Sequence, residues 1–129
     1  MSDAVLDASA ILAVLQAEPG GEIVSEMLRT EVGHVSAVNL SEVVTRLAER
    51  GKLEPEIRAD IEKLRLGTVA FDSEDAYQAG LMRPPTRQAG LSFGDRACLA
   101  LAQRLGLPAV TADRGWTTLQ LPITVQLIR

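Results

Sequence analysis

The sequence predicts a single α/β domain built around a parallel sheet that helices cover on both faces. Short apolar segments typical of strands alternate with longer segments in which apolar residues recur at helical spacing. The chain of 129 residues has the usual length of one domain. Hydrophobic residues make up 47% of it and aromatic residues only 3%, so the core must consist mainly of Ala, Leu, Val and Ile. We therefore interpret residues 1–129 as one domain.

The first half of the chain begins with a strand at residues 4–7, "AVLD", which is short and apolar. Helical spacing follows over residues 9–18 and stops at a Pro-Gly-Gly turn, and a second helix is predicted over residues 22–29. A second strand is expected at residues 34–37. The helix that follows, residues 38–51, is closed by its final glycine.

The second half continues the alternation with a helix over residues 55–67, in which Pro55 occupies the first turn and Gly67 ends the helix. Acidic residues lead this helix, and Lys63 and Arg65 follow them at its end, which matches the helix dipole. A third strand is predicted at residues 68–71. Ser73 is expected to cap the helix of residues 74–83.

Pro84 and Pro85 interrupt the chain before a helix at residues 93–105, so we expect residues 83–90 to form the most mobile loop. A fourth strand is predicted at residues 107–113. The chain closes with a short turn or helix at residues 114–119 and a strand at residues 123–128. Strands that alternate with helices imply right-handed crossovers and a parallel sheet covered on both faces.

Composition argues against several classes of function. One cysteine, Cys98, and one histidine, His34, are too few for a zinc site, and we expect both to be structural. No apolar run approaches the roughly 20 residues that cross a membrane, and no basic segment suggests a signal peptide. We therefore expect a cytoplasmic protein. Its net charge of -4 argues against a broad basic surface for nucleic acid.

Four acidic residues are predicted to lie at one edge of the sheet. Asp7 and Asp113 end strands, whereas Glu42 and Asp95 lie near the beginning of helices. In a parallel sheet, the carboxyl ends of strands and the N-termini of the following helices meet at the edge where ligands bind. We therefore expect these four carboxylates to converge.

Each of these acids also has a purely structural interpretation. The two that end strands could cap the helices after them, and Asn39 and Ser92 precede the other two acids at or near capping-box spacing. Capping alone does not explain why all four acids lie at one edge. The conjunction therefore favours a functional site.

Converging carboxylates repel one another unless a cation lies among them. Oxygen ligands without a soft partner favour Mg²⁺ or Mn²⁺, and one or two such ions suit hydrolysis of a phosphodiester. Two divalent ions would also offset the net charge of -4. The arginines predicted near this edge, which could bind phosphates, are Arg46, Arg83, Arg87, Arg96 and Arg114.

These segments resemble the motifs of the PIN domain family, specifically the VapC-type toxin ribonucleases of bacterial and archaeal toxin-antitoxin pairs. "VLDASA" is similar to the first motif, with Asp7 and Ser9, and "SAVNLSEV" to the second, with Glu42. "LSFGDRACLALA" is similar to the third motif, with Asp95, and "TADRGW" to the fourth, with Asp113. The resemblance runs along nearly the whole chain.

The resemblance implies a three-layer α/β/α fold with a central parallel five-stranded sheet. It implies that the four acids hold Mg²⁺ or Mn²⁺, with Ser9 and Thr111 in support. The family cuts RNA endonucleolytically with metal-activated water, usually as a homodimer. The implied protein is the toxin of a type II pair, silenced by a cognate antitoxin. Many relatives carry a further acid after the fourth motif, but "RGWTTLQ" has none, so a second metal ion would have one ligand fewer.

The helices of residues 9–18 and 22–29 carry more apolar residues than one core-facing stripe requires, so we place the antitoxin groove there. An ordinary core role is the alternative for these side chains. The residues expected to contact the antitoxin are Leu12, Leu15, Met27 and Leu28.

Other functions fit the sequence less well. A haloacid-dehalogenase-like phosphatase needs a second aspartate where this chain has Ser9, and like a receiver domain it needs a lysine near the site. The only lysines in the sequence are Lys52 and Lys63, and neither belongs to the four motifs. The remaining alternative is a non-catalytic PIN-fold module that binds RNA or protein without cutting.

Overall fold

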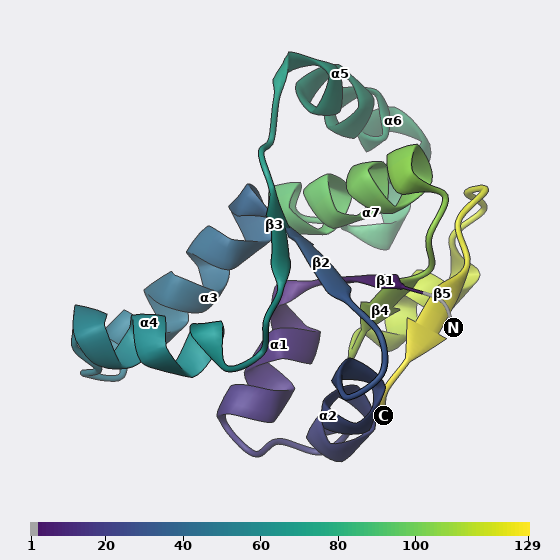
Figure 1. The fold of residues 1–129 in the computed structure, drawn as a ribbon. Helices are drawn as coiled ribbons and strands as arrows, with labels where there is room; N and C mark the ends of the chain where they lie inside the picture. Colours follow the sequence, from purple (N-terminus) through teal and green to yellow (C-terminus); the bar gives the residue numbers. More distant parts are fainter. Residues whose placement is uncertain (1–2) are drawn as a thin grey trace.

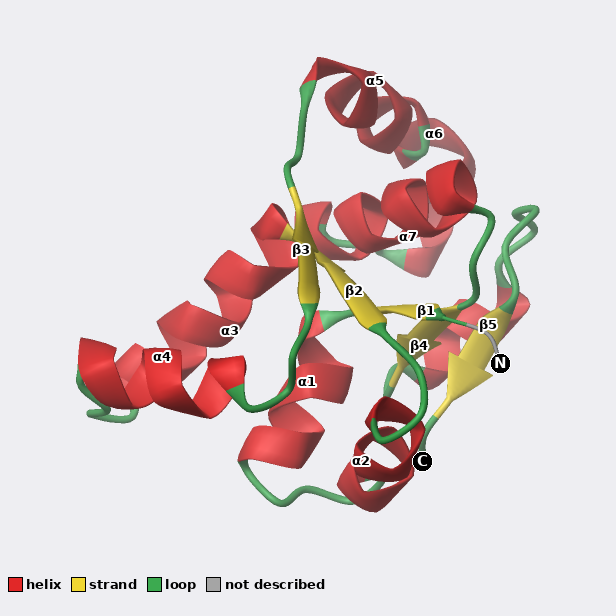
Figure 2. Cartoon of the chain, viewed as in Figure 1, coloured by secondary structure: helices red, strands yellow, loops and turns green. Residues whose placement is uncertain are grey.

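The computed structural model describes residues 3–129, which form a parallel sheet between two layers of helices (Figures 1 and 2). Within these residues the strand order is β3-β2-β1-β4-β5, and every neighbouring pair is parallel. Val5 pairs with His34 on one side and Ala109 on the other. The five-stranded α/β/α fold that the resemblance implied is confirmed. The strands are β1 (Ala4–Leu6), β2 (Gly33–Ser36), β3 (Gly67–Val69), β4 (Ala109–Thr111) and β5 (Val125–Leu127).

The helices divide into two groups, one on each face of the sheet. In Figure 1, α1 to α4 lie below and to the left of the strands, and α5 to α7 lie above them. The α-helices are α1 (Ala8–Leu15), α2 (Gly21–Leu28), α3 (Ala37–Glu49), α4 (Glu54–Glu62), α5 (Ser73–Leu81), α6 (Arg83–Thr86) and α7 (Phe93–Leu105). Two 3-10 helices, η1 (Arg87–Ala89) and η2 (Arg114–Thr118), complete the secondary structure of residues 3–129.

The sheet separates two hydrophobic cores, and β1 shows how. Ala4 and Leu6 point into the core under α1 to α4, whereas Val5 points into the core under α5 and α7. All three residues are buried because a central parallel strand is covered on both faces. β1 is thus a rigid support for the residue that follows it, Asp7.

Helix α7 is the most deeply buried helix on the second face. Gly94 and Ala97 to Ala102 are buried, including the free thiol of Cys98 as expected. Arg104 near its C-terminus donates to both carboxylate oxygens of the buried Asp75 on α5, at 2.8 and 3.2 Å. These contacts hold α7 in place, and with it Asp95 in its first turn.

The segment around the double proline differs from the prediction. Residues 83–90, expected to be a loop, form α6 and η1. Pro84 and Pro85 fit because they lie in the first turn, where a helix needs no N–H donors. The hydroxyl of Thr86 donates to the carbonyl of Met82 at 2.6 Å. A double proline can therefore begin a helix as well as end one.

Several predicted boundaries are also wrong. Helix α4 ends at Glu62, and Gly67 begins β3, because Arg65 already adopts a left-handed conformation with φ 51°. Asp72, not Ser73, caps α5 by accepting from the backbone of Asp75. Gly21, expected to lie in a turn, is the first residue of α2.

Among residues 3–129, no helix is long and apolar enough to cross a membrane.

We predict that Gly21→Ala destabilises the protein by about 1–3 kcal/mol, because its new methyl would collide with the backbone carbonyl of Ala13 where α2 packs on α1. Gly80→Ala is the matched control, since a methyl at this exposed position on α5 meets nothing within 4 Å. It should gain up to about 1 kcal/mol from helix propensity. Urea unfolding measures both changes, and equal stabilities would contradict the prediction.

Candidate active site at the carboxyl edge of the sheet

Asp7 follows β1 and is the N-cap of α1. Its Oδ1 accepts from the backbone N–H of Ala10 at 2.9 Å and from the hydroxyl of Ser9 at 2.7 Å. Its Oδ2 accepts from the hydroxyl of Thr111 at 2.6 Å. The residue is only 5% exposed. Asp7 is therefore a buried carboxylate held by donors from α1 and from β4.

Ser9 and Thr111, the two predicted supporting residues, both contact Asp7 and also organise the chain after β4. The Ser9 hydroxyl oxygen accepts from the backbone N–H of Ala112 at 2.9 Å. The Thr111 hydroxyl oxygen accepts from the backbone N–H of Asp113 at 3.0 Å. The carboxyl ends of β1 and β4 are thus joined through these hydroxyl groups.

Asp113 and Asp95 both take part in helix capping. Asp113 is the N-cap of η2 and accepts from the backbone N–H of Gly115 at 2.8 Å. Asp95 forms a capping box with Ser92: its Oδ2 accepts from the Ser92 backbone N–H at 2.9 Å, and its own N–H donates to the Ser92 hydroxyl at 3.1 Å. The predicted capping by these two acids is therefore confirmed, and part of each carboxylate remains exposed at the surface.

Glu42 is held differently, because it lies in the second turn of α3 and caps nothing. Its Oε1 accepts from the side-chain amide of Asn39 at 2.9 Å. The N-cap of α3 is Ser36, so the capping box expected between Asn39 and Glu42 does not form. The carboxylate of Glu42 rests against Gly94 in the first turn of α7.

All four acids line one cleft of about 340 Å³ at the carboxyl edge of the sheet. The cleft lies where strand order reverses between β1 and β4, the position at which parallel sheets bind ligands. Three of its polar residues were not predicted from the sequence to belong to the site: Glu18, Asn39 and Arg129. For Asn39 a signal existed, since it precedes Glu42 by three residues on a helix. Ala8, Ser9, Leu12 and Arg46 complete the lining.

Burial and neighbouring charge perturb two of these carboxyl groups. Burial raises the pKa of Asp7 to about 6, although hydrogen bonds from Thr111 and Ser9 oppose the change, and the charge of Asp95 adds to it. Burial also raises the pKa of Asp95, against the bonds from Ser92, and the charge of Asp113 contributes. The cleft is therefore a place where negative charge is costly.

The donor set suits a hard divalent cation. Among residues 3–129, no three or more His, Cys, Asp or Glu side chains are already arranged around a single metal position. The four acids nevertheless offer only oxygen atoms, which Mg²⁺ and Mn²⁺ prefer, and a cation would offset the burial and the repulsion from Asp113 that raise the pKa of Asp95. The chemistry of the residues thus fits the predicted metal.

Of the five predicted phosphate-binding arginines, Arg46 lines the cleft. Arg83 and Arg96 donate to the backbone carbonyls of Leu91 and Ala79 on the α5 to α7 side. Arg87 on η1 and Arg114 on η2 are outside the lining of the cleft.

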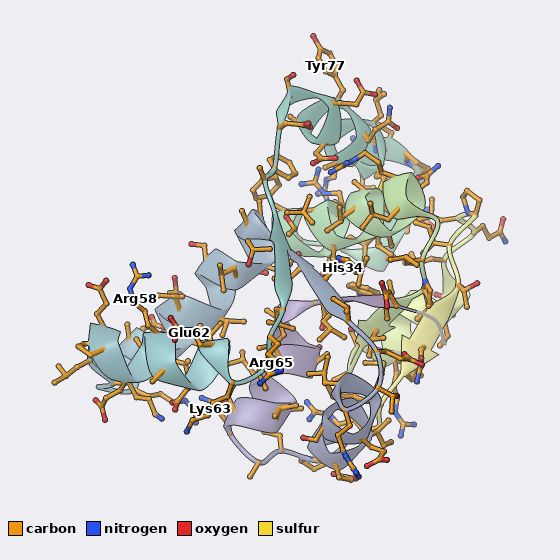
Figure 3. The ribbon with its side chains drawn as sticks, in the orientation of Figure 1. His34, Arg58, Glu62, Lys63, Arg65 and Tyr77 are labelled. Carbon is orange, nitrogen blue, oxygen red and sulfur yellow. The ribbon has the colours of Figure 1, made fainter. Side chains whose placement is uncertain are left out.

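The predicted antitoxin contacts lie on α1 and α2 and take part in core packing. Leu12 is buried, and it also lines the cleft. Leu15, Met27 and Leu28 are half-buried against the same core. His34, expected to be structural, lies on β2 (Figure 3), where its Nε2 is 3.2 Å from a carboxylate oxygen of Asp3.

The sequence matches the PIN domain family over residues 4–120. The chain belongs to the PIN domain family. This match covers every strand except β5 and all four acids of the cleft. No curated protein sequence matches the chain.

Solved structures of PIN proteins share this fold at low sequence identity. VapBC2 of Rickettsia felis, bound to a DNA fragment from its promoter, has a TM-score of 0.77 and 14% identity over 98% of this chain and 99% of that one. DNA-bound VapBC of Salmonella typhimurium has a TM-score of 0.74 and 20% identity over 100% of both chains. VapC20 of Mycobacterium tuberculosis, a toxin that cleaves the sarcin-ricin loop, has a TM-score of 0.74 and 17% identity over 93% of this chain and 96% of that one.

We predict that the metal-free protein loses stability as the pH rises through the pKa of Asp7. An unfolded carboxyl titrates near 3.8 and folded Asp7 near 6, so the folded state binds the proton more tightly. The contribution of Asp7 to stability is greatest below pH 3.8 and declines by about 3 kcal/mol until the pH exceeds about 6. Asp7→Asn cannot ionise and should lack this loss.

The measurement is urea unfolding in a chelating buffer at several values from about pH 4 to about pH 7. Asp60→Asn serves as the control, because Asp60 pairs with Lys52 outside the cleft. Parallel stability profiles for wild type and Asp7→Asn would contradict the prediction.

Proposed function

We propose that this chain is the toxin of a VapC-type toxin-antitoxin pair and acts as a metal-dependent endoribonuclease. The observation that carries the proposal is the meeting of four chain-distant acids in one cleft of a PIN domain. Structural neighbours support it, since they include toxin-antitoxin complexes and a toxin that cleaves the sarcin-ricin loop. Cleavage of an RNA phosphodiester is the reaction that best fits such a cleft.

Asp7, Glu42, Asp95 and Asp113 would hold one or two Mg²⁺ or Mn²⁺ ions. Such an ion supplies activation of water and neutralisation of phosphate charge. The residues around the acids keep them in place: the hydroxyl groups of Ser9 and Thr111 hold the two oxygens of Asp7. Carboxylates that are held close together repel one another, so bringing them together costs free energy unless a cation binds among them. This cost is consistent with a site that is active only with the metal ion bound.

RNA binding would combine this acidic cleft with nearby arginines. Arg46 lies one helical turn after Glu42 and lines the cleft, so it can bind a phosphate beside the acids. We keep Arg83, Arg87, Arg96 and Arg114 as weaker candidates, because they lie outside the lining.

We further propose a cytoplasmic homodimer that a cognate antitoxin silences by binding at α1 and α2. The contacts we expect there are Leu12, Leu15, Met27 and Leu28. Three of them are half-buried against the core and retain exposed apolar area for a partner.

We predict that Asp95→Asn lowers RNA cleavage at least about 100-fold while the protein stays folded. Asparagine keeps the shape and most of the capping ability of Asp95 but removes a charge from the cleft. Purified wild type and variant are incubated with total bacterial RNA and Mn²⁺ or a chelator, and new 5′ ends are sequenced.

Asp60→Asn is the matched control, because it removes the same charge from a pair with Lys52 outside the cleft. It should cut as the wild type does. If the folded wild type binds RNA but produces no new ends with Mn²⁺, the proposed activity is wrong and the non-catalytic binding module takes its place.

We predict that replacing Met27 and Leu28 with aspartate weakens antitoxin binding at least about tenfold, because charge replaces apolar contact area. Tyr77→Asp is the control, since Tyr77 projects from α5 far from α2 (Figure 3) and is 70% exposed. Affinity is measured by calorimetry after circular dichroism has shown each variant to be folded. Unchanged affinity in the double variant would show that the antitoxin does not bind at these residues of α2.

A further inference from the structure

Asn39 links the second acid of the cleft to the helix that carries the third. It is only 1% exposed, in the first turn of α3. Its side-chain amide nitrogen donates to Oε1 of Glu42 at 2.9 Å and to the backbone carbonyl of Gly94 on α7, also at 2.9 Å. One buried amide thus contacts an acid from α3 and the first turn of α7.

Gly94 provides the second half of this arrangement. A methyl group at this position would collide with the carboxylate of Glu42, so the absence of a side chain on Gly94 creates the space that Glu42 occupies. The colliding atoms are the end of a flexible side chain and not backbone. Filling the space would therefore displace Glu42 and leave the packing of α3 on α7 largely intact.

Folding alone does not account for an asparagine at this position. The carbonyl oxygen of Asn39 is buried without a hydrogen-bond partner in the described part of the chain, a rare and unfavourable condition. Asn39 does not cap α3 either, since Ser36 does so. Asn39 also lines the acidic cleft, so its amide lies where it can orient the carboxylate of Glu42.

We propose that Asn39 is a positioning residue, which with Gly94 fixes the carboxylate of Glu42 beside the first turn of α7. Asn39 would act through Glu42 and have no contact with the metal or the RNA. The arrangement keeps the carboxylate of Glu42 in a fixed position relative to Asp95 and Asp7. This inference rests on the proposed metal-dependent function.

The test compares Asn39→Ala and Asn39→Leu, which both lack the donor but change side-chain volume in opposite directions. Mn²⁺ affinity is measured without RNA by electron paramagnetic resonance, and the melting temperature is recorded for each protein. We expect both variants to bind Mn²⁺ about 10- to 100-fold more weakly than wild type, the usual effect of removing a partner that orients a metal ligand. We expect Asn39→Leu to melt no lower than wild type.

Gly94→Ala tests the same idea without touching a hydrogen-bonding side chain. It should weaken Mn²⁺ binding to a similar extent, whereas Gly80→Ala on α5, where a methyl meets nothing within 4 Å, should leave it unchanged.

The outcomes separate this inference from the proposed function. If wild type binds Mn²⁺ and the two Asn39 variants bind equally well, only the positioning role is overturned. If only one of the two variants binds Mn²⁺ more weakly, the cause is the change in side-chain volume and not the loss of the donor, and the positioning role is overturned as well. If wild type binds no Mn²⁺, the metal-dependent function fails, and the positioning role fails with it.

Discussion

The burial of the Asp7 carboxylate at the end of β1 is the constraint on which the rest of the site depends. Its donors come from the backbone of α1 and from hydroxyl groups on α1 and at the end of β4. A buried charge requires such partners, and here they join the two strands between which the strand order reverses. The hydrogen bonds oppose the rise in the pKa of Asp7 but do not cancel it. The cost that remains is what a bound cation would offset.

Helix capping and the proposed chemistry use the same atoms. Asp7, Asp95 and Asp113 each accept a backbone N–H at the beginning of a helix. Capping limits the side-chain rotamers, so it also orients the carboxylate at the cleft. A structural interpretation of an acid therefore does not compete with a functional one. Glu42 does not cap a helix, and its carboxylate is oriented instead by the hydrogen bond from Asn39 and by the space beside Gly94.

The two cores explain why acids can be tolerated at this edge. β1 is buried on both faces, and α7 contributes a continuous buried surface behind Asp95. Both elements are stabilised by apolar packing that the carboxylates do not interrupt, because the acids lie at the ends of the elements. Rigid elements with charged ends can hold ligands in place at little expense to the core.

The sequence by itself determined the order of the strands and helices and the edge at which the four acids lie. Hydrophobic periodicity and capping depend on neighbouring residues, and chain direction then assigns the carboxyl ends of parallel strands to one edge. The tertiary structure decided the rest: that Asn39 bonds Glu42 and Gly94 instead of capping α3, that Arg96 donates to a carbonyl of α5, and that the double proline begins α6. The bonds from Asn39 to Gly94 and from Arg96 to Ala79 join residues distant in the chain, which local patterns do not encode. The double proline is a local feature, but the same residues can end a helix or begin one, so the pattern alone does not decide between the two.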